Sequence, residues 1–600
     1  MIKNNRRKGL TIVEVLVGSA IFAMIAVSVY EGYTQMLRGM NVLKVKSAAV
    51  DLANEQFEII RNMAYSNVGI PGGIPVGVVP HLQNLTRNGV SFLVTTTVRN
   101  IDEAFDGTLG GSPNDSSPAD NKLVEVEVDC VNCQSFTPIV YSTKISPKNL
   151  ETASINGALF IKVFDANGQP VSGADVHIEN KKVTPNIIID DTTNASGMLQ
   201  IVDTPPGNDA YEITVSKAGY STDKTYTPGA VANPNPAKPH ATIVLQQVTQ
   251  ISLTIDKLSD LNISTINSSC AGVGNVDFNI KGSKLIGSSP DIYKYENDLE
   301  TNASGIKNLT NMEWDNYSIN LTDSGYDLIG MNPLSPVQLN PDSNQNMSII
   351  LASKSPNRLL ITVKDNATYL PLTDADVHLE AVSSGYDNTK ITGRGFLTQT
   401  DWSGGSGQTD YSNENMYLSS DGNIDNSSIT GEIKLNTLLG IYSTSGELIS
   451  STFDTGSASN FHEILWQPTS NSPEAGIDPV KFQIAVNNDP ATSTWNYIGP
   501  DGTESSYYTL TNKNISSDSD GNRYFRYKLF LHTDSATTSP VVSDISVTFT
   551  SACTPAGQVS FAGLASGDYN LTVSKAGYQD YNQVVTVNSS WKEEQVLLAP

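Results

Sequence analysis

The most apolar stretch of the chain runs from Leu10 to Tyr30, close to the N-terminus. A helix of about 20 residues crosses the ~30 Å apolar core of a bilayer, so this stretch predicts one membrane span. The preceding segment, Met1 to Gly9, is basic and polar, and cationic flanks stay on the cytoplasmic side. We therefore expect the remainder of the chain to be exported. The polar or small interruptions of the span are Thr11, Glu14, Gly18 and Ser19.

Apolar residues continue at three- and four-residue spacing beyond the span, while charged residues occupy the other positions. This periodicity predicts one long helix over residues 10–64, amphipathic in its second half, with Gln56 as the polar lapse on its apolar stripe. A Gly- and Pro-rich stretch from Gly69 to Pro80 ends the helix. The stripe consists of Val42, Val45, Ala49, Leu52, Ile59 and Met63.

Two strand-like runs follow the helix, Val90–Val98 and Leu123–Cys130. They are rich in β-branched residues or alternate between apolar and polar positions, as strands do. We expect them to form a small sheet against the helix within residues 65–150. The segment between them, from Gly107 to Asn121, is rich in turn-forming residues and predicts a loop.

The 600-residue chain is too long for one hydrophobic core, since such cores stop growing near ~250–300 residues. After residue 64 it is rich in Gly, Asn, Ser, Thr and Asp and poor in helical patterns, which predicts many short strands. We therefore expect a mostly β fold behind the N-terminal helix. The formal net charge of −25 makes the body strongly acidic, which argues against nucleic acid or an anionic membrane as its partner.

A repeated pattern of strands organises this body. The first copy covers residues 155–248, and we expect its last strand at Ile243–Leu245. The second copy covers residues 249–352, with its last strand at Ile349–Leu351. In both copies the last strand ends 25 residues after a Gly-Tyr pair, so we interpret the match as structural.

The third copy is split along the sequence. Its first part covers residues 357–403, and its second part resumes at residues 553–600. The sequence Val-Ser-Lys-Ala-Gly-Tyr is identical at residues 215–220 of the first copy and 573–578 of the third. We therefore predict that a separate domain, residues 404–552, is inserted into the third module, at a loop whose two ends lie close together.

Four cysteines, Cys130, Cys133, Cys270 and Cys553, allow three disulfide connectivities, and the sequence does not choose among them. The pair Cys130 and Cys133 suits a local disulfide or inert thiols. A zinc half-site or a redox motif is the alternative, but no second CxxC or nearby His supplies the remaining ligands.

Glu14 is the anomaly of the apolar run, because an acidic group in a membrane span costs about 2.5–3.5 kcal/mol and usually marks a function. A secretory signal peptide would have a shorter apolar region of ~7–15 residues, and an ordinary single-pass anchor is the other alternative. The stretch Arg7–Val17 resembles the leader of type IV prepilins and pseudopilins, with basic residues, Gly9, a hydrophobic residue and then Glu14.

By that resemblance, prepilin peptidase cuts after Gly9 and methylates the new amine of Leu10. Glu14 then becomes the fifth residue of the mature chain, where its carboxylate would pair with the terminal amine of a neighbouring subunit during assembly. Two charges that are each costly in hydrocarbon would neutralise each other only when the subunits are in register. Leu10 departs from the usual Phe of the family, but both residues are large and apolar. The segment Leu52–Asn62 also resembles the corresponding helix of minor pilins and type II secretion pseudopilins.

The three copies resemble carboxypeptidase regulatory-like domains, which are small Greek-key sandwiches found as surface spacers. The related pilus modules that form internal Lys–Asn isopeptide bonds need a buried Glu, and that place is taken here by Val215, Leu321 and Val573, so we expect no such bond. The recurring Asp-Val-His at residues 175–177 and 376–378 is explained by the repeated strand, whose alternation puts Asp and His on one solvated face.

Residues 451–549 of the inserted domain resemble bacterial galactose-binding-like jelly rolls. Trp466, Trp495 and Tyr497 could stack on sugar rings, although such aromatic residues more often fill the core of a sandwich. Asp518 and Asp520 have the spacing that begins a calcium loop, but no Glu follows at the twelfth place, and a plain turn is the alternative. We expect no cofactor otherwise, and a structural calcium ion is the one candidate.

The sequence contains no nucleophile elbow, HExxH motif, phosphate loop or paired carboxylates, so we do not expect an enzyme. We interpret the chain as a minor pilin or pseudopilin-like subunit that displays β modules for adhesion. Its expected partners are other pilin subunits, prepilin peptidase and a surface glycan, and we expect an inner-membrane precursor that moves to an extracellular filament. The alternatives are a tip component of a secretion or DNA-uptake pseudopilus and a membrane-tethered glycan-binding protein or enzyme.

Overall fold

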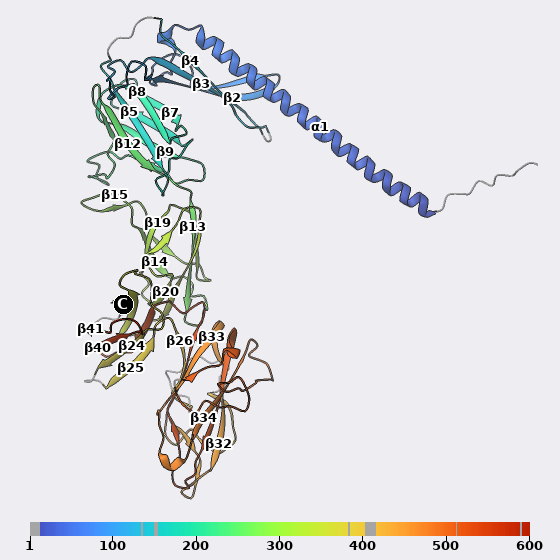
Figure 1. The fold of residues 1–600 in the computed structure, drawn as a ribbon, viewed down its shortest axis with the longest axis vertical. Coiled ribbons are helices and arrows are strands. Elements are labelled where there is room, and N and C mark those ends of the chain that lie inside the picture. The colour runs from blue at the N-terminus through green and yellow to red at the C-terminus, as the bar shows by residue number, and fades with distance from the viewer. Residues whose placement is uncertain are drawn as a thin grey trace, which may run out of the picture. The chain divides into compact units, whose positions relative to one another are not determined.

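The computed structural model describes residues 12–133, 136–148, 154–381, 385–402, 416–511, 513–588 and 591–600. One long helix is followed by a series of β-sheets, as expected for a mostly β chain with an N-terminal helix (Figure 1). The chain forms two compact units, which are described separately below. The first is Met1–Lys257 with Leu285–Ile292, and the second is Leu258–Lys284 with Tyr293–Pro600.

The first unit begins with the helix α1 (Ile12–Arg61), followed by a four-stranded antiparallel sheet in the order β1-β2-β3-β4. We call this four-stranded sheet the head. The structure confirms the predicted helix and the two predicted strands, which lie within β2 and β3. The strands are β1 (Leu82–Arg87), β2 (Val90–Ile101), β3 (Asn121–Cys130) and β4 (Ile139–Ile145).

The second half of α1 packs on this sheet, and its buried face includes the predicted positions Ala49, Leu52 and Gln56 but differs from the predicted stripe elsewhere. Gln56 is only 6% exposed, and its Oε1 accepts a hydrogen bond from Nε2 of Gln83 at 3.3 Å, so this polar residue belongs to the buried face. Ile59 is 46% exposed and does not belong to it. The buried residues recur about every 3.6 residues, because that is the number of residues per turn of a straight helix and so the spacing at which side chains face the same sheet. Its residues are Ala48, Ala49, Leu52, Ala53, Gln56, Phe57 and Ile60.

The first module completes the first unit with two sheets, β10-β9-β6-β7, which β11 joins through β9, and β12-β5-β8. The predicted last strand at Ile243–Leu245 is wrong. β12 closes the module because it pairs in parallel with β5, whereas β11 pairs with β9. The module therefore extends beyond residue 248. Its strands are β5 (Gly157–Phe164), β6 (Asp175–Asn180), β7 (Ile187–Thr192), β8 (Met198–Thr204), β9 (Gly207–Ser216), β10 (Asp223–Lys224), β11 (Ala241–Ile243) and β12 (Val248–Thr254).

The second module opens the second unit with the sheets β18-β13-β22-β20 and β17-β14-β19-β21, and the hairpin β15-β16 interrupts its sequence at Leu285–Ile292, which belong to the first unit. It starts at Ser259, later than predicted, because the preceding strand belongs to the first module. Its strands are β13 (Ser259–Asn267), β14 (Asp277–Gly282), β15 (Leu285–Gly287), β16 (Ile292–Tyr293), β17 (Glu296–Glu300), β18 (Ile306–Met312), β19 (Asp315–Leu321), β20 (Tyr326–Asn332), β21 (Val337–Leu339) and β22 (Asn344–Ser353).

The third module is assembled from two distant parts of the sequence. β23 pairs with β39 and β42, and β24 pairs with β40, so both sheets combine strands from before and after the inserted domain. Its strands are β23 (Arg358–Asp365), β24 (Asp376–Ala381), β25 (Tyr386–Ile391), β39 (Gln558–Ala562), β40 (Gly567–Ser574), β41 (Tyr581–Val587) and β42 (Trp591–Leu598).

The inserted domain begins earlier than the predicted residue 404. β26 (Gly395–Gln399) pairs with β38, and Leu397 and Trp402 lie in the hydrophobic core of this domain. The remaining strands are β27 (Tyr417–Ser420), β28 (Ile424–Asp425), β29 (Ile433–Leu435), β30 (Thr437–Leu438), β31 (Ile441–Tyr442), β32 (Ser445–Ser450), β33 (Phe453–Gln467), β34 (Val480–Asn487), β35 (Lys513–Asn514), β36 (Asn522–His532), β37 (Val541–Val542) and β38 (Asp544–Thr550).

Candidate functional site

The first half of α1 carries an apolar surface that the head does not cover. Every residue from Ile12 to Tyr33 is exposed, and the helix projects beyond the sheet in Figure 1. Its most apolar window has a mean hydropathy of 2.4 and none of it is buried, and it is long enough to cross a membrane. So large an apolar surface is stable only in a bilayer or against other subunits. The chain is therefore a membrane-anchored precursor.

Glu14 lies in the first turn of α1 and is exposed on this apolar half. An acidic residue near a helix N-terminus also interacts favourably with the helix dipole. Gly9 and Leu10 lie outside the described residues, so processing at these two positions and the assembly role of Glu14 stay predictions.

Lys122 fixes the point at which the chain leaves α1 and enters the sheet. Its side chain is only 6% exposed, and its Nζ donates hydrogen bonds to the carbonyl oxygens of Tyr65 at 2.8 Å and Val68 at 2.6 Å. The same ammonium lies 4.4 Å from the centroid of the Tyr65 ring. Burial lowers the pKa of Lys122 below its usual range. No sequence pattern predicts this role, since a lysine in an alternating strand is ordinarily solvated.

The four cysteines form two disulfides, Cys130 with Cys133 and Cys270 with Cys553. The first is the local bond that was one of the sequence alternatives. The second joins residues 283 positions apart and lies between two loops of the second unit. Cys270 belongs to the turn between β13 and β14, and Cys553 belongs to the segment that leads from β38 of the inserted domain to β39 of the third module. This bond therefore ties the second module to the point where the chain re-enters the third.

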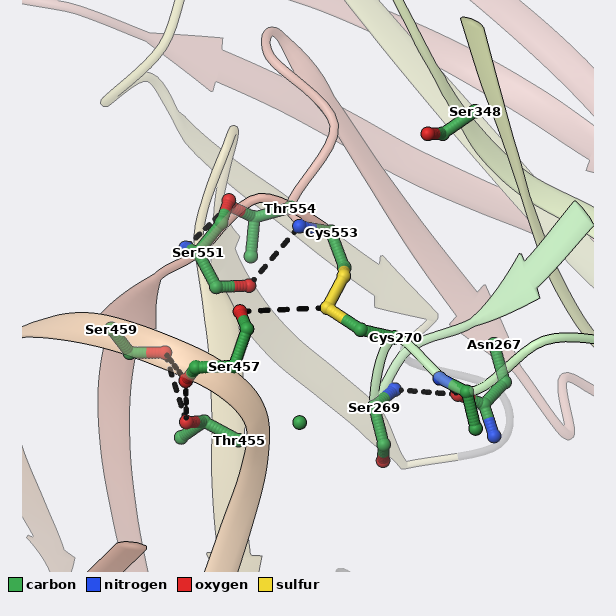
Figure 2. The surroundings of a disulfide bond; sticks show 12 residues. Asn267, Ser269, Cys270, Ser348, Thr455, Ser457, Ser459, Ser551, Cys553 and Thr554 are labelled. Atoms are coloured by element: carbon green, nitrogen blue, oxygen red, sulfur yellow. Dashed lines mark hydrogen bonds between the residues drawn. A yellow bond between two sulfur atoms is a disulfide. The ribbon is translucent and has the colours of Figure 1, made fainter. Parts of the chain in front are cut away.

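The inserted domain also touches this disulfide, as Figure 2 shows. Oγ of Ser457 on β33 lies 3.5 Å from Sγ of Cys270, and the backbone N–H of Cys553 donates to Oγ of Ser551 at 3.2 Å. Gly456 approaches the same turn so closely that a Cβ there would lie 1.8 Å from the carbonyl oxygen of Ser269. Gly456 also has φ +81°, where a side chain is strained. Two modules and the inserted domain thus meet around one covalent bond.

The three aromatic candidates of the inserted domain lie in different surroundings. Trp466 is 3% exposed and packs in the core, 4.8 Å from the ring of Phe482, so its ring cannot reach a ligand. Trp495 is half-buried, and the guanidinium of Arg526 lies 4.2 Å from its ring centroid. Tyr497 is also half-buried, and burial raises the pKa of its hydroxyl while Arg526 lowers it. The structure does not bring the three rings together on one open surface.

Asp518 and Asp520 shape a short turn. The residues Ser517–Ser519 form a 3₁₀ turn, in which Oγ of Ser516 accepts from the N–H of Asp518, and Oδ1 of Asp520 accepts from the N–H of Phe461 at 3.0 Å. In the part of the chain that the structure describes, no group of three or more His, Cys, Asp and Glu is arranged to hold a metal ion. Calcium at Asp518 and Asp520 stays an untested prediction.

A family model for the prokaryotic N-terminal methylation motif matches residues 4–30. No curated protein matches this chain. Among solved structures, the Bacillus anthracis TIE protein is 13% identical with a TM-score of 0.15, over 52% of this chain and 64% of that chain. The chain thus spans less than two thirds of that protein. A Streptococcal ancillary pilin is 11% identical over 38% of this chain and 75% of its own, with a TM-score of 0.17. At such scores these likenesses carry no argument, so the methylation motif is the finding that matters.

The chain therefore combines a prepilin-type methylation motif, an exposed apolar helix and a body of β domains.

Proposed function

We propose that this protein is a minor-pilin-like subunit of a type IV filament system, which displays its β modules at the cell surface for adhesion. The observation that carries the proposal is the division of α1 into an exposed apolar half and a half that packs on the head. One half can exchange lipid for neighbouring subunits, while the other holds the folded head to the filament. No enzymatic step is part of this proposal.

Glu14 has the central role in assembly under this proposal. In the membrane its carboxylate is costly, and pairing with the methylated amine of Leu10 on a neighbouring subunit would remove that cost. Prepilin peptidase would first cut after Gly9. The precursor would therefore stay in the inner membrane until the subunits come into register.

Export of the body is supported by the cysteines. All four are oxidised, and disulfides persist in oxidising compartments outside the cytoplasm. The acidic body would then face the periplasm or the cell exterior, where it could contact partner pilins or a glycan-bearing surface. A pseudopilus tip component is the second candidate, since the same helix would serve it equally.

The test compares Glu14→Ala with Glu31→Ala, which removes an exposed carboxylate further along the same helix. We expect Glu14→Ala to reduce the amount of protein in sheared filaments at least about fivefold, with the precursor still in the membrane, and Glu31→Ala to have little effect. Mass spectrometry of the mature protein should find a chain that starts at a methylated Leu10. Unchanged incorporation of Glu14→Ala, or a chain that starts elsewhere, would contradict the proposal.

A further inference from the structure

A cavity of about 360 Å³ lies within the second unit, between strands of the second and third modules. Its walls come from β19 and β20 on one side and from β23, β39 and β42 on the other. A volume of this size is within the ~300–1,000 Å³ of small-molecule sites. It lies outside the inserted domain, where the sequence placed the candidate binding residues.

Hydrogen bonds between the two modules hold the walls in place. Nε1 of Trp591 donates to the carbonyl oxygen of Leu328 at 2.8 Å. Gln558 bridges both sides, because its Oε1 accepts from the N–H of Met331 at 2.8 Å and its Nε2 donates to Oγ1 of Thr362 at 2.9 Å. A cavity with walls fixed in this way needs little ordering when a ligand enters, which favours binding.

The lining combines aromatic rings with hydrogen-bonding groups. Trp591 and Tyr326, both half-buried, supply the rings. Alternate residues of a strand point to one face, and Trp591, Glu593 and Gln595 of β42 all line the cavity. A flat ring beside amide and carboxylate groups suits a ligand with an apolar face and several hydroxyls.

Asp327 adds a buried acceptor to this lining. Its side chain is 1% exposed, and its Oδ2 accepts from the N–H of Ser355 at 2.8 Å and from Nε of Arg358 at 3.2 Å. Its Oδ1 has no hydrogen-bond donor among the described residues, although Nζ of Lys354 lies 3.6 Å away. Lys354 compensates the charge of this buried carboxylate, which fixes β20 beside the cavity.

Polar side chains along the walls are available for the same purpose. Those of Asn320, Lys364 and Gln595 line the cavity and make no side-chain hydrogen bond within the described residues. The two amides can donate and accept, and the ammonium can donate to ring or hydroxyl oxygens. The carboxylates of Asp323, Asp327 and Glu593 balance the cations of Lys354, Lys364 and Arg358, so the cavity has no surplus of positive charge that would select an anion.

We propose that this cavity binds a neutral saccharide, with one or two sugar rings enclosed between the second and third modules. The apolar C–H face of the sugar packs on Trp591 or Tyr326, and its hydroxyls bond with Asn320 and Gln595. This inference rests on the proposed function, in that a displayed subunit needs a surface ligand. It places the adhesive site between the second and third modules, outside the inserted domain.

The test measures sugar binding to the full chain in detergent micelles by ligand-detected NMR. The probes are glucose, galactose, mannose, N-acetylglucosamine and N-acetylgalactosamine, together with the disaccharide made of two units of each. We expect at least one of these probes to bind. The double substitution Asn320→Ala with Gln595→Ala should weaken that binding about tenfold or more, since two hydrogen bonds to the sugar are lost. Both residues are exposed on their strands, so the fold should not suffer.

The matched control is Asn570→Ala, which removes an exposed amide from β40 of the third module, away from the cavity lining. It should leave binding unchanged. The proposal is overturned if no probe binds the natural chain, or if the double variant binds as tightly as Asn570→Ala does. Filament incorporation of the double variant should remain normal. A loss of sugar binding can therefore be separated from a failure of the assembly role of Glu14, which is measured in filaments without any sugar.

Discussion

The first and third modules have the same fold, but only the third contains another domain. In both, the hydroxyl of a threonine directly after a hairpin, β6-β7 or β24-β25, bonds the loop between the first two strands of the module. Oγ1 of Thr193 donates to the carbonyl oxygen of Val171 at 2.6 Å, and Oγ1 of Thr392 donates to that of Leu372 at 2.7 Å. In the first module the chain continues directly to the turn before β8, whereas in the third it leaves for the inserted domain at this point.

The two modules also share the bonds that lie beyond the insertion point. The hydroxyl of Tyr211 donates to the carbonyl oxygen of Pro205 at 2.6 Å, and that of Tyr569 donates to the carbonyl oxygen of Ala565 at 3.0 Å. The strand pairs β6 with β9 and β24 with β40 have the same register. The module thus keeps its fold although its halves are far apart in sequence, and the third module differs by having a covalent bond at the re-entry point.

The largest effect should come from removing that bond. The double variant Cys270→Ser with Cys553→Ser opens a loop of 283 residues, for which chain entropy gives an upper value of about 5 kcal/mol. The loss should fall on the second module, which holds Cys270, on the third module and on the inserted domain, whereas the first module contains no cysteine. Hydrogen exchange of peptides 569–578 and 211–220 measures the two modules in one sample.

The control for this experiment is Cys130→Ser with Cys133→Ser, which removes the local disulfide of the head. It should leave the hydrogen exchange of both peptides unchanged, since peptide 569–578 lies in the second unit and peptide 211–220 in the first module. Equal loss of protection in peptides 211–220 and 569–578 of the Cys270→Ser, Cys553→Ser variant would show that the bond does not act locally, against this comparison.

A smaller effect should come from the glycine that precedes the strand after the insertion point. Gly197 and Gly557 have φ +66° and φ +67°, and a Cβ would lie 2.7 Å and 2.8 Å from the carbonyl oxygens of Val163 and Val363. Alanine at either position combines a strained backbone with a clash, so we expect about 2–4 kcal/mol of destabilisation in each module. Urea unfolding of each variant measures the loss.

Gly168 provides the control for this pair, since it has φ +75° but nothing lies within 4 Å of a Cβ there. Gly168→Ala should cost only the backbone strain, about 1 kcal/mol. A loss at Gly557→Ala as small as that at Gly168→Ala would mean that the third module relaxes at its split turn, and the two modules would then differ in rigidity as well as in sequence.

Local patterns were enough to predict the helix, the strands of the head and the split of the third module. The membrane span has a long apolar run, and the repeat unit has near-identical segments at residues 215–220 and 573–578. The closing strand of the first module was missed because its parallel pairing with β5 joins residues about 90 apart, and such pairing leaves no local period. The run Ile243–Leu245, in which Ile243 is buried and the other two residues are exposed, looks equally strand-like in sequence.

The candidate site could be predicted only in part, for the same reason. Glu14 was visible because it is a local exception within an apolar run. The cavity between the second and third modules was not visible, because its lining residues, such as Asn320 and Gln595, come from strands far apart in sequence and are ordinary polar residues in each. Trp466 was a candidate by residue type, but only the packing of Phe482 against it shows that it belongs to the core.

The smallest effect in this comparison should be a difference in pH dependence. The hairpin β6-β7 of the first module and the hairpin β24-β25 of the third have the same register. Asp191 of the first module is therefore equivalent to Lys390 of the third. Burial raises the pKa of Asp191, with Arg99 of the head, 3.4 Å away, acting against it. Burial lowers the pKa of Lys390 to about 8, and its Nζ donates to the carbonyl oxygen of Ser560 at 2.7 Å. The same position therefore carries an acidic side chain in one module and a basic side chain in the other, and burial disfavours the charged form of both.

These pKa shifts give the stabilities of the two modules opposite dependences on pH. Between pH 8 and the usual lysine value near 10.5, the unfolded third module binds a proton that the folded one has lost, so its stability rises with pH in that window. The folded Asp191 keeps its proton to a higher pH than the unfolded one, so the first module loses stability as pH rises through the range just above the usual aspartate value. We expect about 1–2 kcal/mol for Lys390, because its side chain is only half-buried by exposed area.

Pulse proteolysis in urea at pH 7 and pH 9.5, with peptides of each module followed by mass spectrometry, resolves the two slopes. Lys390→Met should abolish the rise in stability of the third module, while Lys592→Met, which changes a lysine on β42 paired with Glu594, should retain it. If the third module of Lys390→Met is still more stable at pH 9.5 than at pH 7, another group supplies the slope. The equivalence of the two hairpin positions would then be one of backbone register alone.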